Sequence, residues 1–257
     1  MAKWTKFAHA EKAYEYTPAT LKKNWARLHT GDCEPFPKSD ALVQAWIAFH
    51  AGNFEQAAEL GLAQGMAGYN VANKATNIYA NYLEKSDKKK LDFYQEVAAR
   101  CEEQQAKDKK DPNGFYLYSY AMGRYSQGIS ITKALAQGLG GKVKDALIST
   151  IKLQPKHADA HIGLGAFHAE IIDKVGAMLG GVSYGAKKDE GLRLFKAAIT
   201  MMPHSAVAKI EYANGLVMLE GKKGMKQAEE LYAQAAECAA MDAMERLDVE
   251  AAKEELE

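Results

Sequence analysis

The chain has 257 residues, and its 33 basic side chains balance 33 acidic ones, so the formal net charge is zero. A neutral chain gives no electrostatic reason to expect nucleic acid or an anionic membrane as a partner. Lys3, Lys6 and Glu11 interrupt the N-terminal segment where a signal peptide would carry its apolar core. No window approaches the ~18 apolar residues of a membrane helix. We therefore expect a cytoplasmic protein that neither enters membranes nor binds nucleic acid. Its three widely spaced cysteines favour reduced thiols over disulfides.

Turn residues divide the chain into helix pairs. Thr17 can cap a helix and Pro18 fits its first turn, which predicts a helix running to about His29. Beyond it, helical periods alternate with short turns that contain Gly or Asn, and no sustained two-residue alternation indicates a strand. The predicted pairs are 41–51 with 54–64, 71–83 with 88–105, 115–137 with 143–153, 158–175 with 189–202, and 205–219 with 225–240.

These breaks give a domain organisation in four parts. Residues 1–38 form an N-terminal helix and linker, and residues 39–111 form two degenerate helix pairs. Residues 112–242 form three more regular pairs with an insertion at 171–187, and residues 243–257 form a charged helical tail. The boundary at residue 111 rests on Asp-Pro-Asn-Gly, the strongest turn signal in the sequence.

Several segments follow the tetratricopeptide (TPR) pattern, in which small residues let helices approach and large residues fill the gaps between them. The matching segments are His161-x2-Leu164-Gly165-x2-His168, Gly191-x3-Phe195-x2-Ala198-x4-Pro203 and Ala228-x3-Tyr232-x2-Ala235. The pattern predicts an all-α fold, a right-handed superhelix of antiparallel helix pairs. This TPR-like α-solenoid carries one irregularity, since the spacing from Val143 to Gly191 is too long for one repeat.

The surplus lies at 171–187, which is too apolar for a flexible loop. We interpret it as an extension of the first helix with a folded-back cover. In this respect residues 115–240 resemble two TPR-like families, the T-component of TRAP transporters and the regulator of microtubule dynamics family. Both carry a lengthened hairpin before an Ala-Leu-x2-Phe type of second helix. The resemblance implies a helical-repeat binding scaffold and carries over no catalytic residues.

Three histidines in and directly before one predicted helix suggest a metal site at first sight. His157, His161 and His168 lie on one stripe, but seven residues separate the last two, roughly 10 Å along the axis. One metal with bonds of ~2 Å cannot bridge them, so we predict packing roles and no metal. No nucleophile, base and orienting group share a suitable spacing. The sequence therefore predicts a protein that is not an enzyme and needs no cofactor.

An asparagine stripe marks the first helix of the second pair. Asn70, Asn73, Asn77 and Asn81 recur at intervals of three and four, so they lie on one face. Asparagine is a poor interior helix residue because its amide competes with the backbone. Each amide can, however, donate to and accept from another main chain. The stripe predicts a groove for an extended peptide, and a solvated helix face is the open alternative.

First helices line the concave groove of stacked helix pairs, so the same face of the later pairs should contribute too. The predicted groove residues are Asn73, Asn77, Asn81, Tyr120, Arg124, Gln127, Asp159, Glu170 and Asn214. The expected function is a scaffold that binds a protein or peptide. The alternative is a small-molecule pocket closed by the 171–187 insertion, with polar groups from Glu170, Asp173, Lys174 and Tyr184. Self-association through the ends of the stack, giving a homo-oligomer, also stays open.

Overall fold

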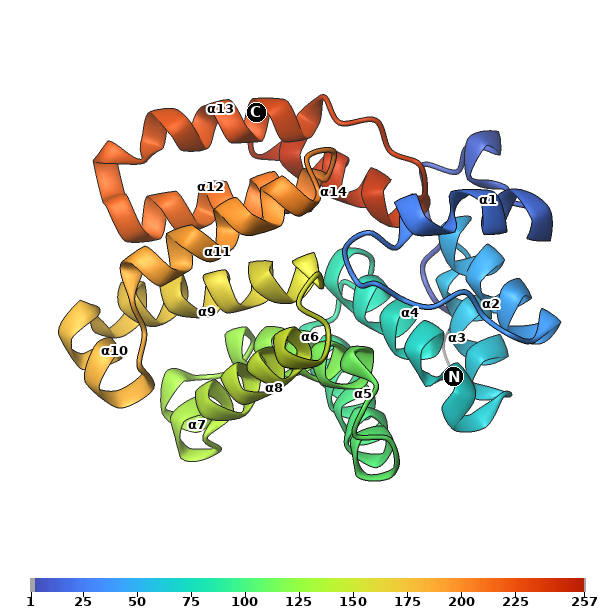
Figure 1. Ribbon diagram of the computed structural model, residues 1–257, viewed down its shortest axis with the longest axis horizontal. Helices are drawn as coiled ribbons and strands as arrows, with labels where there is room; N and C mark the ends of the chain where they lie inside the picture. The colour runs from blue at the N-terminus through green and yellow to red at the C-terminus, as the bar shows by residue number, and fades with distance from the viewer. Residues whose placement is uncertain (1–2, 257) are drawn as a thin grey trace. The chain divides into compact units, whose positions relative to one another are not determined.

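The computed structural model describes residues 3–256, and they form helices joined by turns with no β-strand in that range (Figure 1). The chain divides into two compact units. The first comprises residues 3–29, 33–154 and 241–244, and the second comprises residues 30–32, 155–240 and 245–256. No helix within residues 3–256 is long and apolar enough to cross a membrane.

Helix pairs make up both units. The first unit holds η1 (Lys12–Tyr14), α1 (Pro18–Leu28), α2 (Asp40–His50), α3 (Phe54–Leu62), η2 (Gly65–Gly68), α4 (Tyr69–Tyr82), α5 (Asp87–Lys107), α6 (Pro112–Gln127), α7 (Ile131–Ala136) and α8 (Leu139–Leu153). The second holds α9 (Ala158–Val175), α10 (Ala177–Tyr184), α11 (Lys188–Met201), α12 (Ala206–Glu220), η3 (Gly221–Lys223), α13 (Met225–Ala236) and most of α14 (Ala243–Glu254). Helix α2 packs on α3, α4 on α5, α6 on α8, α9 on α11, and α12 on α13. The predicted all-α architecture of helix pairs is confirmed.

Side-chain caps begin several of these helices. The Thr17 hydroxyl accepts a hydrogen bond from the Thr20 amide, and Thr20 bonds back to Thr17, which closes a capping box at the predicted start of α1. Ser39, Ser86 and Ser205 accept equivalent bonds at the starts of α2, α5 and α12. Each cap satisfies an amide that the helix itself leaves without a partner. The helix starts therefore follow from local sequence chemistry.

The third pair differs from its prediction. The expected helix 115–137 is two helices, because α6 ends at Gln127 and the Ser130 hydroxyl caps the short α7 by accepting from the Lys133 amide. The expected loop 138–141 is also wrong. Only Gly138 leaves helical geometry, with φ +64°, and α8 begins at the next residue. The left-handed conformation interrupts a helix, and glycine adopts it without strain.

Close helix approach organises the second unit. Phe195 of α11 is fully buried, and its ring stacks against Tyr212 with centroids 5.7 Å apart. A Cβ added at Gly165 of α9 would lie 3.0 Å from this ring, and one added at Gly215 of α12 would lie 2.3 Å from it. The two glycines thus make room for the phenylalanine between three helices. Gly165 and Phe195 both occupy positions of the TPR pattern, and Gly215, which lies outside it, completes the site of the ring.

We predict opposite effects for two helical glycines replaced by alanine. Gly215→Ala forces a Cβ into the Phe195 ring and should lower the free energy of unfolding by about 1–3 kcal/mol, as overpacked cores do. Gly123 of α6 has no atom within 4 Å of an added Cβ. Gly123→Ala should therefore raise stability by about 0.5–1 kcal/mol, because alanine favours helix over glycine. Urea unfolding followed by circular dichroism measures both, and loss of stability in both variants would contradict this account.

Candidate binding surface on α6

The asparagine stripe of α4 lies largely inside the first unit. Asn73 and Asn77 are 0% and 1% exposed. Asn73 Oδ1 accepts from Arg100 Nε at 2.6 Å, and its Nδ2 donates to Cys101 Sγ at 3.4 Å. Asn77 Nδ2 donates to the Leu117 carbonyl at 3.3 Å. The placement of these two side chains in an open groove is therefore corrected, because their amides bond to α5 and α6 and are closed to a ligand. Asn81, at the last turn, is half-buried.

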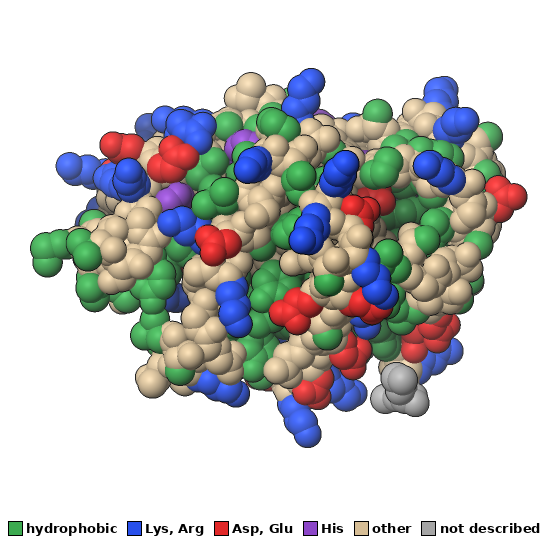
Figure 2. All heavy atoms as spheres, turned by 60° about the horizontal axis from the view of Figure 1, so that its bottom comes forward, with side chains coloured by type: hydrophobic (Ala, Val, Ile, Leu, Met, Phe, Trp, Pro, Cys, Tyr) green, Lys and Arg blue, Asp and Glu red, His purple; other side chains and the backbone are tan. Residues whose placement is uncertain are grey.

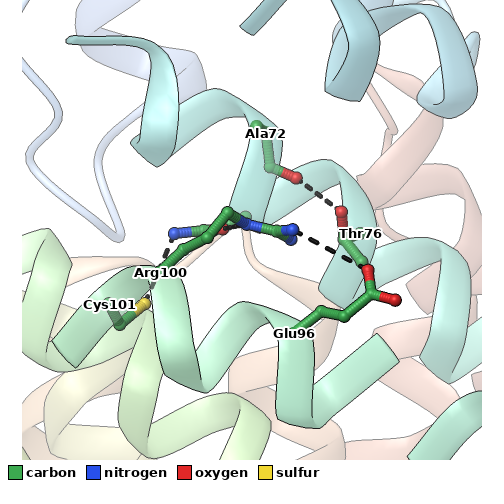
Figure 3. A network of polar contacts seen from close by, with 6 residues as sticks. Ala72, Thr76, Glu96, Arg100 and Cys101 are labelled. Carbon is green, nitrogen blue, oxygen red and sulfur yellow. Dashed lines mark hydrogen bonds and ion pairs between the residues drawn. The ribbon is translucent and has the colours of Figure 1, made fainter. Parts of the chain in front are cut away.

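The contacts of Arg100 explain why Asn73 is held so firmly (Figure 3). Arg100 Nη1 lies 3.8 Å from Glu96 Oε2 one turn away on α5. Burial lowers the pKa of Arg100, and Glu96 offsets part of that effect. A guanidinium stays protonated under such a shift, so its donors need acceptors. Asn73 Oδ1 supplies one. In the same view Thr76 Oγ1 donates to the Ala72 carbonyl at 2.8 Å, so this hydroxyl is satisfied within α4.

A second polar network closes the N-terminal end of the stripe. Asn70 Nδ2 donates to Glu34 Oε2 at 2.9 Å and to Asp111 Oδ2 at 3.1 Å. Gln104 Nε2 donates to Asn70 Oδ1 and to Asp111 Oδ2, both at 2.8 Å. Asn113 Nδ2 donates to Glu34 Oε2 at 2.6 Å. The network binds the 33–39 linker to α4, α5 and α6. Sequence reasoning identified Asp111 only as part of a turn.

The predicted residues of α6 do form a continuous stripe. Tyr120 and Arg124 are half-buried and Gln127 is exposed. The Arg124 guanidinium lies over the Tyr120 ring, with Cζ 5.6 Å from the centroid, and Nη1 donates to Gln127 Oε1 at 3.2 Å. Tyr116 extends the stripe by one turn, with its ring 6.4 Å from that of Tyr120 in a T-shaped arrangement. The sequence analysis missed Tyr116, although its spacing of four residues from Tyr120 was a usable signal.

The buried side of α6 supports this stripe. Tyr94 of α5 is buried behind it. Burial raises the pKa of Tyr94, Tyr120 raises it further, and Arg124 acts in the opposite direction. The Tyr94 hydroxyl therefore stays neutral at all ordinary pH values and adds no charge behind the stripe. Arg124 carries the formal charge of the stripe itself.

The predicted groove residues of the second unit each contact a different structural partner. The Asp159 amide donates to the Gly31 carbonyl at 3.1 Å, and its carboxylate fills the space beside Gly31. Glu170 pairs with Lys174 at 3.0 Å one turn apart on α9. Asn214 Oδ1 accepts from the Tyr232 hydroxyl, which joins α12 to α13. These three side chains have structural partners within their own unit.

The 171–187 insertion folds as the end of α9, Gly176 at φ +81°, and the separate helix α10. Helix α10 packs on α9, and Asp173 is exposed while Tyr184 is half-buried. Met178 and Val182 are each 85% exposed. Figure 2 shows mixed charges over one face and hydrophobic side chains gathered at its left edge, the side on which Figure 1 draws α10. Helix α10 therefore presents Met178, Leu179 and Val182 outward, whereas Ala186 at the end of the insertion is buried.

The histidines of α9 act as structural polar groups. His157 Nδ1 accepts from the Ala160 amide at 3.1 Å and caps the helix, while His161 Nδ1 lies 3.0 Å from the His157 carbonyl. His168 Nδ1 accepts from the Lys187 amide at 3.1 Å and fastens the end of the insertion. Within residues 3–256 no three His, Cys, Asp or Glu side chains are grouped as metal ligands.

Comparisons with known proteins bear on the fold. No protein-family model and no curated protein sequence matches the chain. A solved structure, a thermophilic TPR protein from Thermus thermophilus, is similar with a TM-score of 0.58 and 15% sequence identity. The match covers 83% of this chain and 97% of that one. The fold is a TPR-like α-solenoid. The likeness at this identity concerns the fold alone.

The interior role of Asn73 gives a test by substitution. Asn73→Ala leaves the half-buried Arg100 Nε without its acceptor, so the free energy of unfolding should fall by about 2–3 kcal/mol. Asn81→Ala is the matched control on the same helix, and it should change stability by less than about 0.5 kcal/mol. Chemical unfolding of both variants gives the values. Equal losses would show that Asn73 is not a fixed interior partner of Arg100.

Proposed function

We propose that this chain is a non-catalytic scaffold that binds an extended segment of a partner protein. The observation that carries the proposal is the partly exposed stripe of Tyr116, Tyr120, Arg124 and Gln127 on α6, the first helix of a TPR-like pair. Three of its members follow from the sequence pattern alone. The proposal assigns no catalytic group, cofactor or metal.

The composition of the stripe suits protein recognition. Tyrosine and arginine dominate the energetically important positions of protein interfaces, because they offer large contact areas and directional donors. Arg124 is held over Tyr120 and bonded to Gln127, so little side-chain freedom remains to be lost on binding. A pre-ordered guanidinium favours carboxylates, since its planar donors can bind both oxygens. The favoured partner segment therefore carries an acidic side chain beside an apolar one.

Other predicted features stay part of the proposal. Asn81, Asp159, Glu170, Asp173, Lys174, Tyr184 and Asn214 remain candidate contacts for the same kind of partner. The finer resemblance to the T-component and microtubule-regulator families, the cytoplasmic location and a homo-oligomeric state also remain predictions. The outward orientation of Met178 and Val182 on α10 favours a protein contact over a closed small-molecule pocket.

Peptide selection tests the proposal directly. A random peptide library displayed on phage is selected on the full chain, and the affinity of enriched peptides is measured by fluorescence anisotropy. We expect enriched peptides to carry Asp or Glu next to an aromatic or aliphatic residue. Tyr120→Ala and Arg124→Ala should each weaken their binding at least 10-fold, which is about the loss of one interface hot spot.

Arg193→Ala is the matched control, because Arg193 is an exposed helical arginine paired with Glu190 on α11. It should leave peptide affinity unchanged. The proposal fails if no peptide is enriched, or if Tyr120→Ala, Arg124→Ala and Arg193→Ala behave alike.

A further inference from the structure

The N-terminal segment 3–11 lies extended on the surface of the first unit. It contains no helix before η1. Trp4, Phe7 and His9 are half-buried, while the residues around them, Lys3, Thr5, Lys6, Ala8 and Ala10, are exposed. Its hydrogen bonds to Glu55 of α3 and Tyr79 of α4 place the segment beside these two helices. The segment therefore lies on helix pairs α2–α3 and α4–α5 as a bound peptide would.

Side chains of the helices hold the main chain of this segment. The Trp4 amide donates to Glu55 Oε1 at 3.3 Å, and the Thr5 amide donates to the Tyr79 hydroxyl at 3.2 Å. Bonds of this kind recognise an extended backbone independently of its sequence, because every non-proline residue offers the same amide donor.

Aromatic contacts give the surface its selectivity. Trp4 stacks on Tyr79 with ring centroids 4.1 Å apart and meets Phe93 edge-on at 5.3 Å. Phe7 meets Phe54 at 6.4 Å. Its ring also covers Gly52, where an added Cβ would lie 2.4 Å from Phe7 Cδ1. The two anchors are three residues apart, and each occupies its own site at a different helix pair.

Tyr79 connects the two modes of recognition. Its hydroxyl donates to Glu84 Oε2 at 3.0 Å while it accepts from the Thr5 amide. Burial raises the pKa of Tyr79, and Glu84 adds to this while the Thr5 amide opposes it, so the hydroxyl stays neutral. Although burial acts to raise the pKa of Glu84, bonds from the Ser86 amide and Tyr79 hold it below the ordinary value. A fixed carboxylate thus orients the hydroxyl that receives the segment.

We infer that this surface, formed by Gly52, Phe54, Glu55, Tyr79 and Phe93, is a second peptide-binding site that the chain's own N-terminal segment occupies. Its partner is an extended peptide with a Trp and a Phe three residues apart, and the segment competes with that partner. The inference goes beyond the α6 surface, although it rests on the same proposed role of the fold as a peptide scaffold. Displacement is feasible because two main-chain bonds and a few ring contacts hold the segment on the helices.

The test supplies the segment in trans. A fluorescein-labelled peptide of residues 3–12 is titrated with three proteins: the full chain, a variant lacking residues 1–10, and full-length Trp4→Ala/Phe7→Ala. Both variants should bind the peptide saturably, and the full chain should bind it at least 10-fold more weakly. Replacing Trp and Phe in the peptide by Ala should weaken binding at least 10-fold. Tyr79→Phe in the deletion variant keeps the ring and removes the hydroxyl, so it should weaken binding several-fold.

Circular dichroism of each variant decides how a negative result is interpreted. Helical variants that fail to bind the peptide, or that bind its Ala-substituted form equally well, overturn the inference. Unfolding of both variants also overturns it, because the segment is then a part of the core. If binding of library peptides depends on Arg124 but the peptide of residues 3–12 does not bind, the proposed function holds and the second site is ruled out. If the peptide of residues 3–12 binds but Arg124→Ala has no effect on library peptides, the second site holds and the α6 surface is ruled out.

Discussion

The burial of residues 71–80 in the middle of α4 is the constraint on which the first unit depends. Every residue from 71 to 80 is buried, although the helix carries polar side chains there. A buried polar group without a hydrogen bond costs several kcal/mol, so these side chains bond to neighbouring helices, although Asn77 Oδ1 has no hydrogen-bond partner. Asn73 takes Arg100 and Cys101 from α5, and Asn77 takes the Leu117 carbonyl from α6. These bonds fix the positions of α5 and α6 against α4. Recognition is then left to the far side of α6 and to the last turn of α4, where the N-terminal segment covers Tyr79.

This constraint also explains where sequence reasoning succeeded and where it failed. Periodicity correctly places the asparagines on one face of a helix, because spacing alone determines that geometry. It does not reveal what covers the face, and here the Asn70–Asn77 face is covered by α5 and α6. By contrast, the match of Gly165 with Phe195 was predictable, because a small residue and a large one at motif positions have one packing solution. Gly215 lies outside the motif, and its role appears only when α12 is placed against the ring.

The two proposed binding surfaces differ in predictability for the same reason. The α6 stripe is local, since Tyr120, Arg124 and Gln127 meet through intervals of three and four within one helix. The N-terminal segment has no period, and its contacts join Trp4 and Thr5 to residues 51 and 74 positions later in the chain. Nothing in a short irregular segment predicts such partners. Long-range contacts of extended segments depend on the surface that the rest of the fold creates, so they emerge only from the assembled helices.

The covalent attachment of the segment sets how strongly it competes. A short covalent connection of this kind holds the segment at an effective concentration on the order of 1 mM around the site. If the isolated segment binds with a dissociation constant of ~0.1 mM, the site is occupied about nine-tenths of the time, and a competing peptide loses about tenfold in apparent affinity. A partner needs only a modestly better sequence, or a second contact on the α6 stripe, to displace it. An occupied surface of this kind discriminates against weak aromatic peptides and still admits a partner that binds at two places.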